Sequence, residues 1–395
     1  MGFLLCIDPM ILGIDASRAN HDQKTGVEWY AFFLIEEMKK LTGAYPNLRV
    51  VLYADQPLRG SLARMPQHWT QKVLSWPPRR LWTQFRLSWE MLLHPPDVLF
   101  IPAHVFPIIH PKKTVMTVHD VAAFRFPKAY SWFERWYSIW SASYAARRLW
   151  KVIVPSFFSK KELLALLTAG NRPDAVYDSE RIMVIPHGYD PAYGAPVSPA
   201  AIDATRKKFG IGGPFLLAIG RLEYKKNTAI LIHAFENIKQ RGGERVQNLA
   251  LVLAGKPGVG YETIASIREA SPYRKDIIET GWISNLDARC LMKVADVFVF
   301  PSLYEGFGMP VLEAFASGTP AVVSKGNSLE EVGGSAALYA DPTDLKQVEE
   351  ALFRLVTDSH LREEYAQKGL SRVRKFSWRS SAEKTVDVLL NAMTT

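Results

Sequence analysis

The segment PSLYEGFGMPVLEAFASGTPAVVS, from Pro301 to Ser324, decides the fold of this chain. It follows the residues VFVF (Val297–Phe300), and a short uncharged run of β-branched and aromatic residues predicts a buried strand. The next residues predict a helix that begins near Met309, tolerates Pro310 in its first turn and ends at Gly318. The residues TPAVVS predict a second strand, so the segment reads as a βαβ unit.

Two glutamates in this segment are candidates for a ligand site. Glu305 follows the first strand, and Glu313 lies in the first turns of the helix. Ligands of such units bind beyond the carboxyl ends of the strands. Each glutamate also has a structural explanation, because the helix dipole favours an acidic residue near a helix start and a glutamate after a strand is often only solvated.

Length and composition indicate a folded protein of two domains. The chain has 395 residues, of which 48% are hydrophobic and 22% charged. Its two cysteines, Cys6 and Cys290, form no CxxC or Cys/His cluster. This argues against a disulfide framework or a structural zinc site and fits a reducing compartment.

The sequence predicts a cytoplasmic protein. No uncharged run reaches the roughly 18 residues that a membrane-spanning helix needs. The N-terminal residues MGFLLCIDPM have no basic region and reach Asp8 too early for a secretory signal.

Positive charge is concentrated in the first half of the chain. Residues 1–200 hold 23 Lys and Arg against 16 Asp and Glu, out of a net charge of +9. Arginines alternate with aromatic residues in Arg79–Arg86 and Tyr130–Lys151. Such stretches fit an anionic membrane surface, or a core helix with buried aromatic side chains. No nucleic-acid motif accompanies the charge, so no nucleic-acid partner is expected.

Strand-like and helical patterns alternate on both sides of a Pro- and Gly-rich stretch, Pro191–Ala201. This alternation predicts an α/β fold with two Rossmann-like domains that face a cleft. The motifs of common nucleotide sites are missing: there is no GxGxxG, no DxD, and GKPGVG at Gly255 does not complete a Walker A motif.

Cations and a histidine follow other predicted strands. Gly220 ends a strand and is followed by Arg221 and Lys226, which could stabilise the charge on a departing diphosphate or could form only a solvated turn. Gly26 precedes a predicted helix, VEWYAFFLIEEM, whose N-terminus suits a phosphate. His119 ends a strand, where a histidine is commonly a hydrogen-bonded structural residue.

Taken together, these segments resemble glycosyltransferase family 4, the retaining GT-B glycosyltransferases. The resemblance covers nearly the whole chain, in the family's order, through TGVE near Gly26, VHD at His119, VPSFFSKKEL at Pro155, IPHGYD at Ile185, GRLEYKKN at Gly220 and EGFGMPVLEAFASGTPAVVS at Glu305. It implies an acceptor-binding domain in residues 1–195, a nucleotide-sugar domain in residues 196–375 and a C-terminal helix in residues 376–395 that crosses back to the first domain.

The resemblance also implies a set of site residues. Glu305 would contact sugar hydroxyls, Glu313 the ribose hydroxyls, and Arg221 and Lys226 the diphosphate. The implied catalytic residues are His119, Arg221, Lys226 and Glu305. The implied donor-binding residues are Gly26, Gly220, Arg221, Lys226, Ile283, Glu305, Gly306, Phe307, Gly308, Met309 and Glu313, and no metal ligand or cofactor is expected.

The activity implied is retaining, metal-independent hexosyl transfer in cell-surface polysaccharide synthesis. The segments VHDVAAFRFP and RLWTQFRL look like those of bacterial mannosyltransferases. GDP-mannose is therefore the first expected donor and a UDP-hexose the second. A glycan or lipid-linked glycan is the expected acceptor, and the chain is expected in the cytoplasm or at the inner face of the membrane. Two alternatives remain open: a sugar-nucleotide epimerase of the same fold, and a nucleotide-sugar-binding protein without catalysis.

Overall fold

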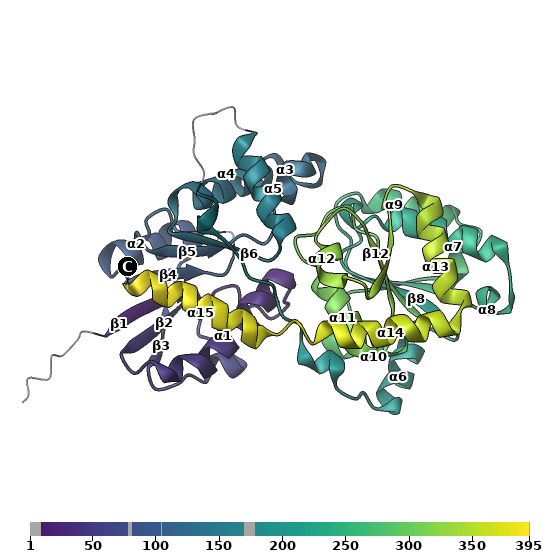
Figure 1. Cartoon of the computed structure of the whole chain (residues 1–395), viewed down its shortest axis with the longest axis horizontal. Helices are drawn as coiled ribbons and strands as arrows, with labels where there is room; N and C mark the ends of the chain where they lie inside the picture. The colour runs from purple at the N-terminus through teal and green to yellow at the C-terminus, as the bar shows by residue number, and fades with distance from the viewer. Residues whose placement is uncertain (1–8, 78–80, 104, 170–177, 395) are drawn as a thin grey trace, which may run out of the picture. The chain divides into compact units, whose positions relative to one another are not determined.

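The structure, a computed structural model, describes residues 9–77, 81–103, 105–169 and 178–394. Cys6 and the arginines Arg79 and Arg80 lie outside the described residues. The chain forms two compact units, the first made of Met1–Phe124, Trp132–Gly188 and Ser377–Thr395, and the second of Arg125–Ser131 and Tyr189–Phe376 (Figure 1). The chain therefore passes from the first unit to the second mainly after Gly188, a few residues before the predicted domain boundary at residue 195.

The first unit contains a seven-stranded parallel sheet in the order β3-β2-β1-β4-β5-β6-β7. The strand order reverses between β1 and β4, which makes this the position where an open parallel sheet usually binds its ligand. The strands are β1 Met10–Asp15, β2 Leu48–Ala54, β3 Trp69–Val73, β4 Val98–Ile101, β5 Thr114–Thr117, β6 Lys151–Val154 and β7 Ile182–Val184.

The second unit contains a six-stranded parallel sheet in the order β10-β9-β8-β11-β12-β13. Here the strand order reverses between β8 and β11. The strands are β8 Phe215–Ile219, β9 Ala250–Ala254, β10 Ile277–Gly281, β11 Val297–Phe300, β12 Ala321–Ser324 and β13 Ala337–Ala340. The predicted α/β fold with two Rossmann-like domains is confirmed.

Helices connect the parallel strands in both units (Figure 1). The first sheet is accompanied by α1 Gly26–Leu41, the π-helical turn η3 Thr83–Leu87, α2 Ser88–Leu93, α3 Ala122–Arg125, α4 Trp132–Arg148, α5 Phe157–Thr168 and α15 Trp378–Thr394. The second is accompanied by α6 Pro199–Phe209, α7 Thr228–Arg241, α8 Glu244–Gln247, α9 Tyr261–Ala270, α10 Asn285–Val294, α11 Met309–Ser317, α12 Leu329–Gly333, α13 Leu345–Thr357 and α14 Ser359–Val373.

The segment Pro301–Ser324 folds as its sequence predicts. Strand β11, helix α11 and strand β12 follow one another as a βαβ unit, and α11 ends at Gly318 in the left-handed conformation. Strand β11 is buried on both faces: Val297 and Val299 pack in one core cluster, and Phe298 and Phe300 in another. This explains why the strand is a continuous apolar run.

The last helix, α15, returns to the first unit and packs along α1 (Figure 1). Trp378, at its start, stacks on Phe33 of α1 with ring centroids 5.6 Å apart. Gly188 lies against the same turn, because a Cβ atom there would be 2.2 Å from the backbone nitrogen of Trp378. Packing therefore fixes the outgoing and returning segments of the chain to each other within the first unit.

Helix α4 exposes its tryptophans instead of burying them. Trp132 is 80% exposed and Trp136 is 52% exposed, whereas the buried residues of the helix are Ser141, Ala142, Ala145 and Ala146. The interpretation that the aromatic residues of Tyr130–Lys151 are buried in the core is therefore wrong for the N-terminal half of α4. Within the described residues, no helix is long and apolar enough to cross a membrane.

Candidate active site

The central feature of the second unit is an ion pair between two predicted site residues. Lys226 Nζ lies 2.6 Å from Glu305 Oε1, and both side chains are largely buried. Lys226 follows β8 and Glu305 follows β11, so the pair lies at the carboxyl ends of the two strands where the sheet order reverses. Arg221 lies exposed in the turn after β8. The structure thus places two cations and a carboxylate where such a sheet binds its ligand.

Backbone and side-chain hydrogen bonds hold the two loops that carry this pair. The backbone N–H of Leu303 donates to the carbonyl oxygen of Lys225 (2.9 Å). Asn227 Nδ2 donates to the carbonyl oxygen of Pro301 (3.2 Å). Ser328 Oγ lies 2.7 Å from the carbonyl oxygen of Glu305 and 3.1 Å from that of Phe307. The geometry of the site therefore depends on residues that carry none of its charge.

The turn Gly306–Met309 leads into the N-terminus of α11, which is a suitable place for phosphate or sugar oxygens. Gly308 has a φ of +102°, and a Cβ atom there would lie 2.3 Å from Leu329 Cδ2. Only glycine fits both constraints. Gly306 and Phe307 are buried, and Met309 packs partly buried against the core, as does Ile283.

Glu313 lies one turn further along α11, in an acidic and apolar environment. Burial, and then the negative charge of Asp190, raises the pKa of Glu313 to about 8, although a hydrogen bond with Tyr193 acts in the opposite direction. Asp190 is held in place by Ala192, whose N–H donates to Oδ1, and by Asn285, whose Nδ2 donates to Oδ2. A protonated or ionised Glu313 can hydrogen-bond vicinal hydroxyls such as those of a ribose.

The raised pKa of Glu313 predicts a pH-dependent stability. In the unfolded chain this carboxyl ionises near its ordinary value of 4.5, whereas in the folded protein it stays protonated up to about pH 8. Its contribution is complete below the unfolded pKa and is lost as the pH rises through the folded pKa. The free energy of unfolding should therefore fall by about 2–4 kcal/mol more in the native protein than in Glu313→Gln between pH 4.5 and 8.

Urea melts at several pH values measure this difference, with Glu363→Gln as a control, since Glu363 is exposed on α14. Parallel pH profiles for the native protein and Glu313→Gln would show that Glu313 titrates normally.

A contact between two glycines forms the base of the loop that carries the cations. A Cβ atom on Gly255, at the end of β9, would lie 1.7 Å from the carbonyl oxygen of Gly220, at the end of β8. The backbone of one strand end therefore rests directly on the other. Gly255 is the first residue of GKPGVG, the stretch that does not complete a Walker A motif. Its lack of a side chain permits the close approach of the two strand ends.

Replacement of Gly255 by alanine should lower the free energy of unfolding by about 3 kcal/mol, because backbone atoms cannot move aside as a flexible side chain can. Gly212→Ala is the matched control, since a Cβ atom there would meet nothing within 4 Å. Urea melts of the two variants measure the effect. Equal stability of the two would mean that the strand ends separate freely.

The remaining predicted residues, Gly26 and His119, belong to the first unit. Gly26 is the exposed first residue of α1, and Thr25 and Glu28 form a capping box around it. His119 is buried, and its Nε2 donates to the carbonyl oxygen of Pro102 (2.9 Å). Its ring lies 5.4 Å from that of His187, and burial, and then His119, holds the pKa of His187 well below its ordinary value. His119 is therefore hydrogen-bonded within the first unit, as expected of a structural histidine at a strand end.

The predicted site residues thus divide between the two units. The second unit brings together Gly220, Arg221, Lys226, Ile283, Glu305, Gly306, Phe307, Gly308, Met309 and Glu313 around the carboxyl ends of its strands. Sequence reasoning assigned no role to Asp190, Gly255 or Ser328. The described residues include no group of three or more His, Cys, Asp or Glu that could hold a metal ion.

Two family models match the chain, one in each half. "Glycosyltransferase Family 4" matches residues 25–193, and "Glycosyl transferases group 1" matches residues 201–372. The fold and these matches define a glycosyltransferase. The two models together cover most of the sequence in the expected order, so the resemblance of the chain to glycosyltransferase family 4 is confirmed.

Named relatives include mannosyltransferases. The chain is 27% identical to O-antigen chain mannosyltransferase B of Escherichia coli over 311 residues, which cover 78% of this chain and 77% of that protein. It is 32% identical to the serotype-specific mannosyltransferase WbdA of Escherichia coli over 190 residues. That match covers 47% of this chain but 23% of WbdA, so the chain matches less than a quarter of the length of this relative.

Solved GT-B glycosyltransferases share the fold. WaaG, a glycosyltransferase involved in lipopolysaccharide biosynthesis, matches with a TM-score of 0.69 and 16% identity over 96% of this chain and 99% of that one. Anabaena Alr3699/HepE, in complex with UDP-glucose, matches with a TM-score of 0.70 and 17% identity over 97% and 99%. At this identity the likeness establishes the fold alone.

Proposed function

We propose that the chain is a retaining hexosyltransferase that uses GDP-mannose as donor and a glycan or lipid-linked glycan as acceptor, in cell-surface polysaccharide synthesis. The observation that carries the proposal is the Lys226–Glu305 ion pair at the strand ends of the second unit, with Arg221 in the turn directly after β8 and the N-terminus of α11 following Glu305. These groups match the chemistry of a sugar diphosphate: cations for the phosphates, and a carboxylate for the sugar hydroxyls.

The proposed reaction proceeds on one face of the sugar. The bond between the anomeric carbon and the diphosphate oxygen breaks, and the acceptor oxygen bonds to the same face of that carbon. The acceptor proton passes to the departing phosphate oxygen, so the step needs no protein nucleophile. Arg221 and Lys226 stabilise the charge that develops on the diphosphate, and the reaction is proposed to need no metal ion.

Mannose is favoured as the transferred sugar by the E. coli mannosyltransferases among the relatives. A UDP-hexose is the second candidate, since Alr3699/HepE was solved with UDP-glucose. A sugar-nucleotide epimerase would convert its substrate without an acceptor, and a pure binding protein would bind the donor without turnover. The cation pair argues against the binding protein, because binding alone does not require stabilisation of a leaving group.

A thermal-shift panel of GDP, UDP, ADP and their hexose conjugates tests the donor. A ligand at 100 times its dissociation constant stabilises the protein by about 2.7 kcal/mol. We expect stabilisation by GDP and GDP-mannose, lost in Glu313→Ala. A response to uridine nucleotides instead would assign a UDP-sugar, and no response to any nucleotide would contradict the donor site.

Contact with the inner face of an anionic membrane is part of the proposal. Trp132, Phe133 and Trp136 are exposed on α4 beside the exposed Arg135. Aromatic rings at the headgroup level and a cation facing lipid phosphates suit such a surface. Sedimentation with anionic vesicles should be weaker for Trp132→Ala and at high salt. Equal sedimentation with neutral and anionic vesicles would contradict the electrostatic part.

A further inference from the structure

A cavity of about 930 Å³ opens in the first unit, at the position where its strand order reverses. The segments that line it follow β1, β2 and β4 and include η3 and α4. None of the residues assigned to the donor site lines it. Because open parallel sheets bind ligands beyond the strand ends at this position, the cavity is a candidate binding site.

One half of the cavity is polar and its loops are tied together. Asn20 Nδ2 donates to the carbonyl oxygen of Pro57 (3.1 Å), and the N–H of Arg59 donates to Asn20 Oδ1 (3.0 Å). These bonds join the loop after β1 to the loop after β2. Asp55 is half-buried here, and within the described part of the chain it forms no hydrogen bond or ion pair. Its carboxylate is available to accept hydrogen bonds from ligand hydroxyls.

The other half is mainly aromatic and aliphatic, although Thr83, Gln84 and Tyr137 also line it. The rings of Trp136 and Trp140 stack on α4 with centroids 6.0 Å apart and an angle of 7° between their planes. Phe106, after β4, stacks on Trp140 at 5.5 Å. Leu81 and Ile108 complete this half and are 51% and 57% exposed.

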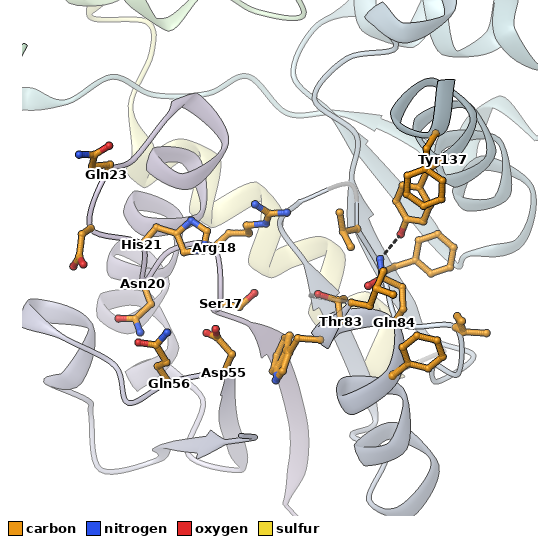
Figure 2. A pocket seen from close by; sticks show the side chains of 18 of the residues that line it. Ser17, Arg18, Asn20, His21, Gln23, Asp55, Gln56, Thr83, Gln84 and Tyr137 are labelled. Carbon is orange, nitrogen blue, oxygen red and sulfur yellow. Dashed lines mark hydrogen bonds between the residues drawn. The ribbon is translucent and has the colours of Figure 1, made fainter. Parts of the chain in front are cut away.

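Figure 2 shows side chains on two sides of this cavity. Ser17, Asp55 and Gln56 lie on one side, whereas Thr83, Gln84 and Tyr137 lie on the other. A hydrogen bond from Gln84 Nε2 to Tyr137 Oη (3.0 Å) joins η3 to α4 on this second side. The side chain of Arg18 extends into the space between the two sides.

We propose that this cavity binds an amphiphilic acceptor, a saccharide linked to a hydrocarbon chain, with the saccharide at Asp55 and the chain along Trp136 and Trp140. The assignment rests on the proposed glycosyltransferase function and names the acceptor class. Aromatic faces alone would suit a plain glycan. Leu81 and Ile108 offer no flat ring for a sugar, however, and their exposed aliphatic surface suits hydrocarbon.

Calorimetric titration with alkyl glycosides tests this assignment on the full chain. The probes are octyl and methyl glycosides of mannose, glucose and galactose, each below its micelle concentration. Burial of only about two methylenes changes an affinity by about tenfold. We therefore expect at least one octyl glycoside to bind more than about tenfold tighter than its methyl counterpart, and Trp136→Ala to remove this advantage.

Two further variants separate the cavity from general hydrophobic contact. Trp89→Ala removes a tryptophan of similar exposure, 58% against 52%, that does not line the cavity, and should leave the advantage unchanged. Trp136→Phe keeps an aromatic ring and should restore most of it. Equal binding of octyl and methyl glycosides, no binding of any probe, or equal losses in Trp136→Ala and Trp89→Ala would each overturn the assignment.

This test is independent of the donor. A chain that responds to nucleotides but shows no octyl advantage would lose the acceptor assignment and keep the proposed function. A chain that shows the octyl advantage but responds to no nucleotide would keep an amphiphile site and lose the proposed function.

Discussion

Glu305→Ala is expected to lower kcat for nucleotide-sugar turnover by about 100- to 1000-fold, the usual loss when one group that acts on the transition state is removed. The carboxylate has two roles in the proposed mechanism. It accepts hydrogen bonds from the sugar hydroxyls, and it holds Lys226 Nζ at 2.6 Å. Its removal therefore releases both the sugar and one of the two cations that face the departing diphosphate.

The control for Glu305→Ala is Glu279→Ala. Glu279 pairs with Arg268 in the same unit, and the side chains of the two glutamates are 14% and 12% exposed. Both variants lose a largely buried ion pair, so a general loss of stability would affect them alike. Steady-state rates of nucleotide release separate the two effects. Near-normal turnover by Glu305→Ala would contradict its assigned role.

Lys226→Ala is expected to cause a loss of about the same size, because a cation that neutralises a leaving group acts mainly in the transition state. The loss should appear in kcat more than in KM. Lys225→Ala is the matched control, since it removes a lysine from the same turn at a position outside the predicted set. Equal rates for the two variants would remove Lys226 from the mechanism.

The double variant gives a sharper test of the pair. Residues in direct contact do not act independently, so their effects do not add. The loss in Glu305→Ala combined with Lys226→Ala should be clearly smaller than the product of the two single losses. A combined loss equal to the product of the two single losses would show that the ion pair has no part in turnover.

The central strands of both sheets could be predicted from the sequence, because they are buried on two faces. Strand β11 is the clearest case, with alternate residues in two separate core clusters. The edge strands β3 and β10 are harder to predict from the sequence. Gln71 and Lys72 in β3 and Glu279 in β10 are polar and at least partly exposed, so these two strands lack a continuous apolar pattern.

The charged residues at strand ends could be proposed from the sequence, because parallel strands bring their carboxyl ends to one edge of a sheet. The sequence alone could not show that Lys226 and Glu305 form an ion pair, because the two residues are far apart along the chain. It could not show the approach of Gly255 to Gly220 either. Similarly, Asp190 and Ser328 act through tertiary contacts that have no local sequence pattern.

Release of nucleoside diphosphate from GDP-mannose and from UDP-glucose, measured side by side with the octyl glycosides as acceptors, tests the proposed function most directly. We expect GDP release that depends on acceptor, exceeds UDP release and falls by about 100-fold or more in Glu305→Ala. Faster release from UDP-glucose would reassign the donor. Absence of release from either donor, while the alkyl glycosides still bind, would contradict glycosyl transfer at the Lys226–Glu305 site.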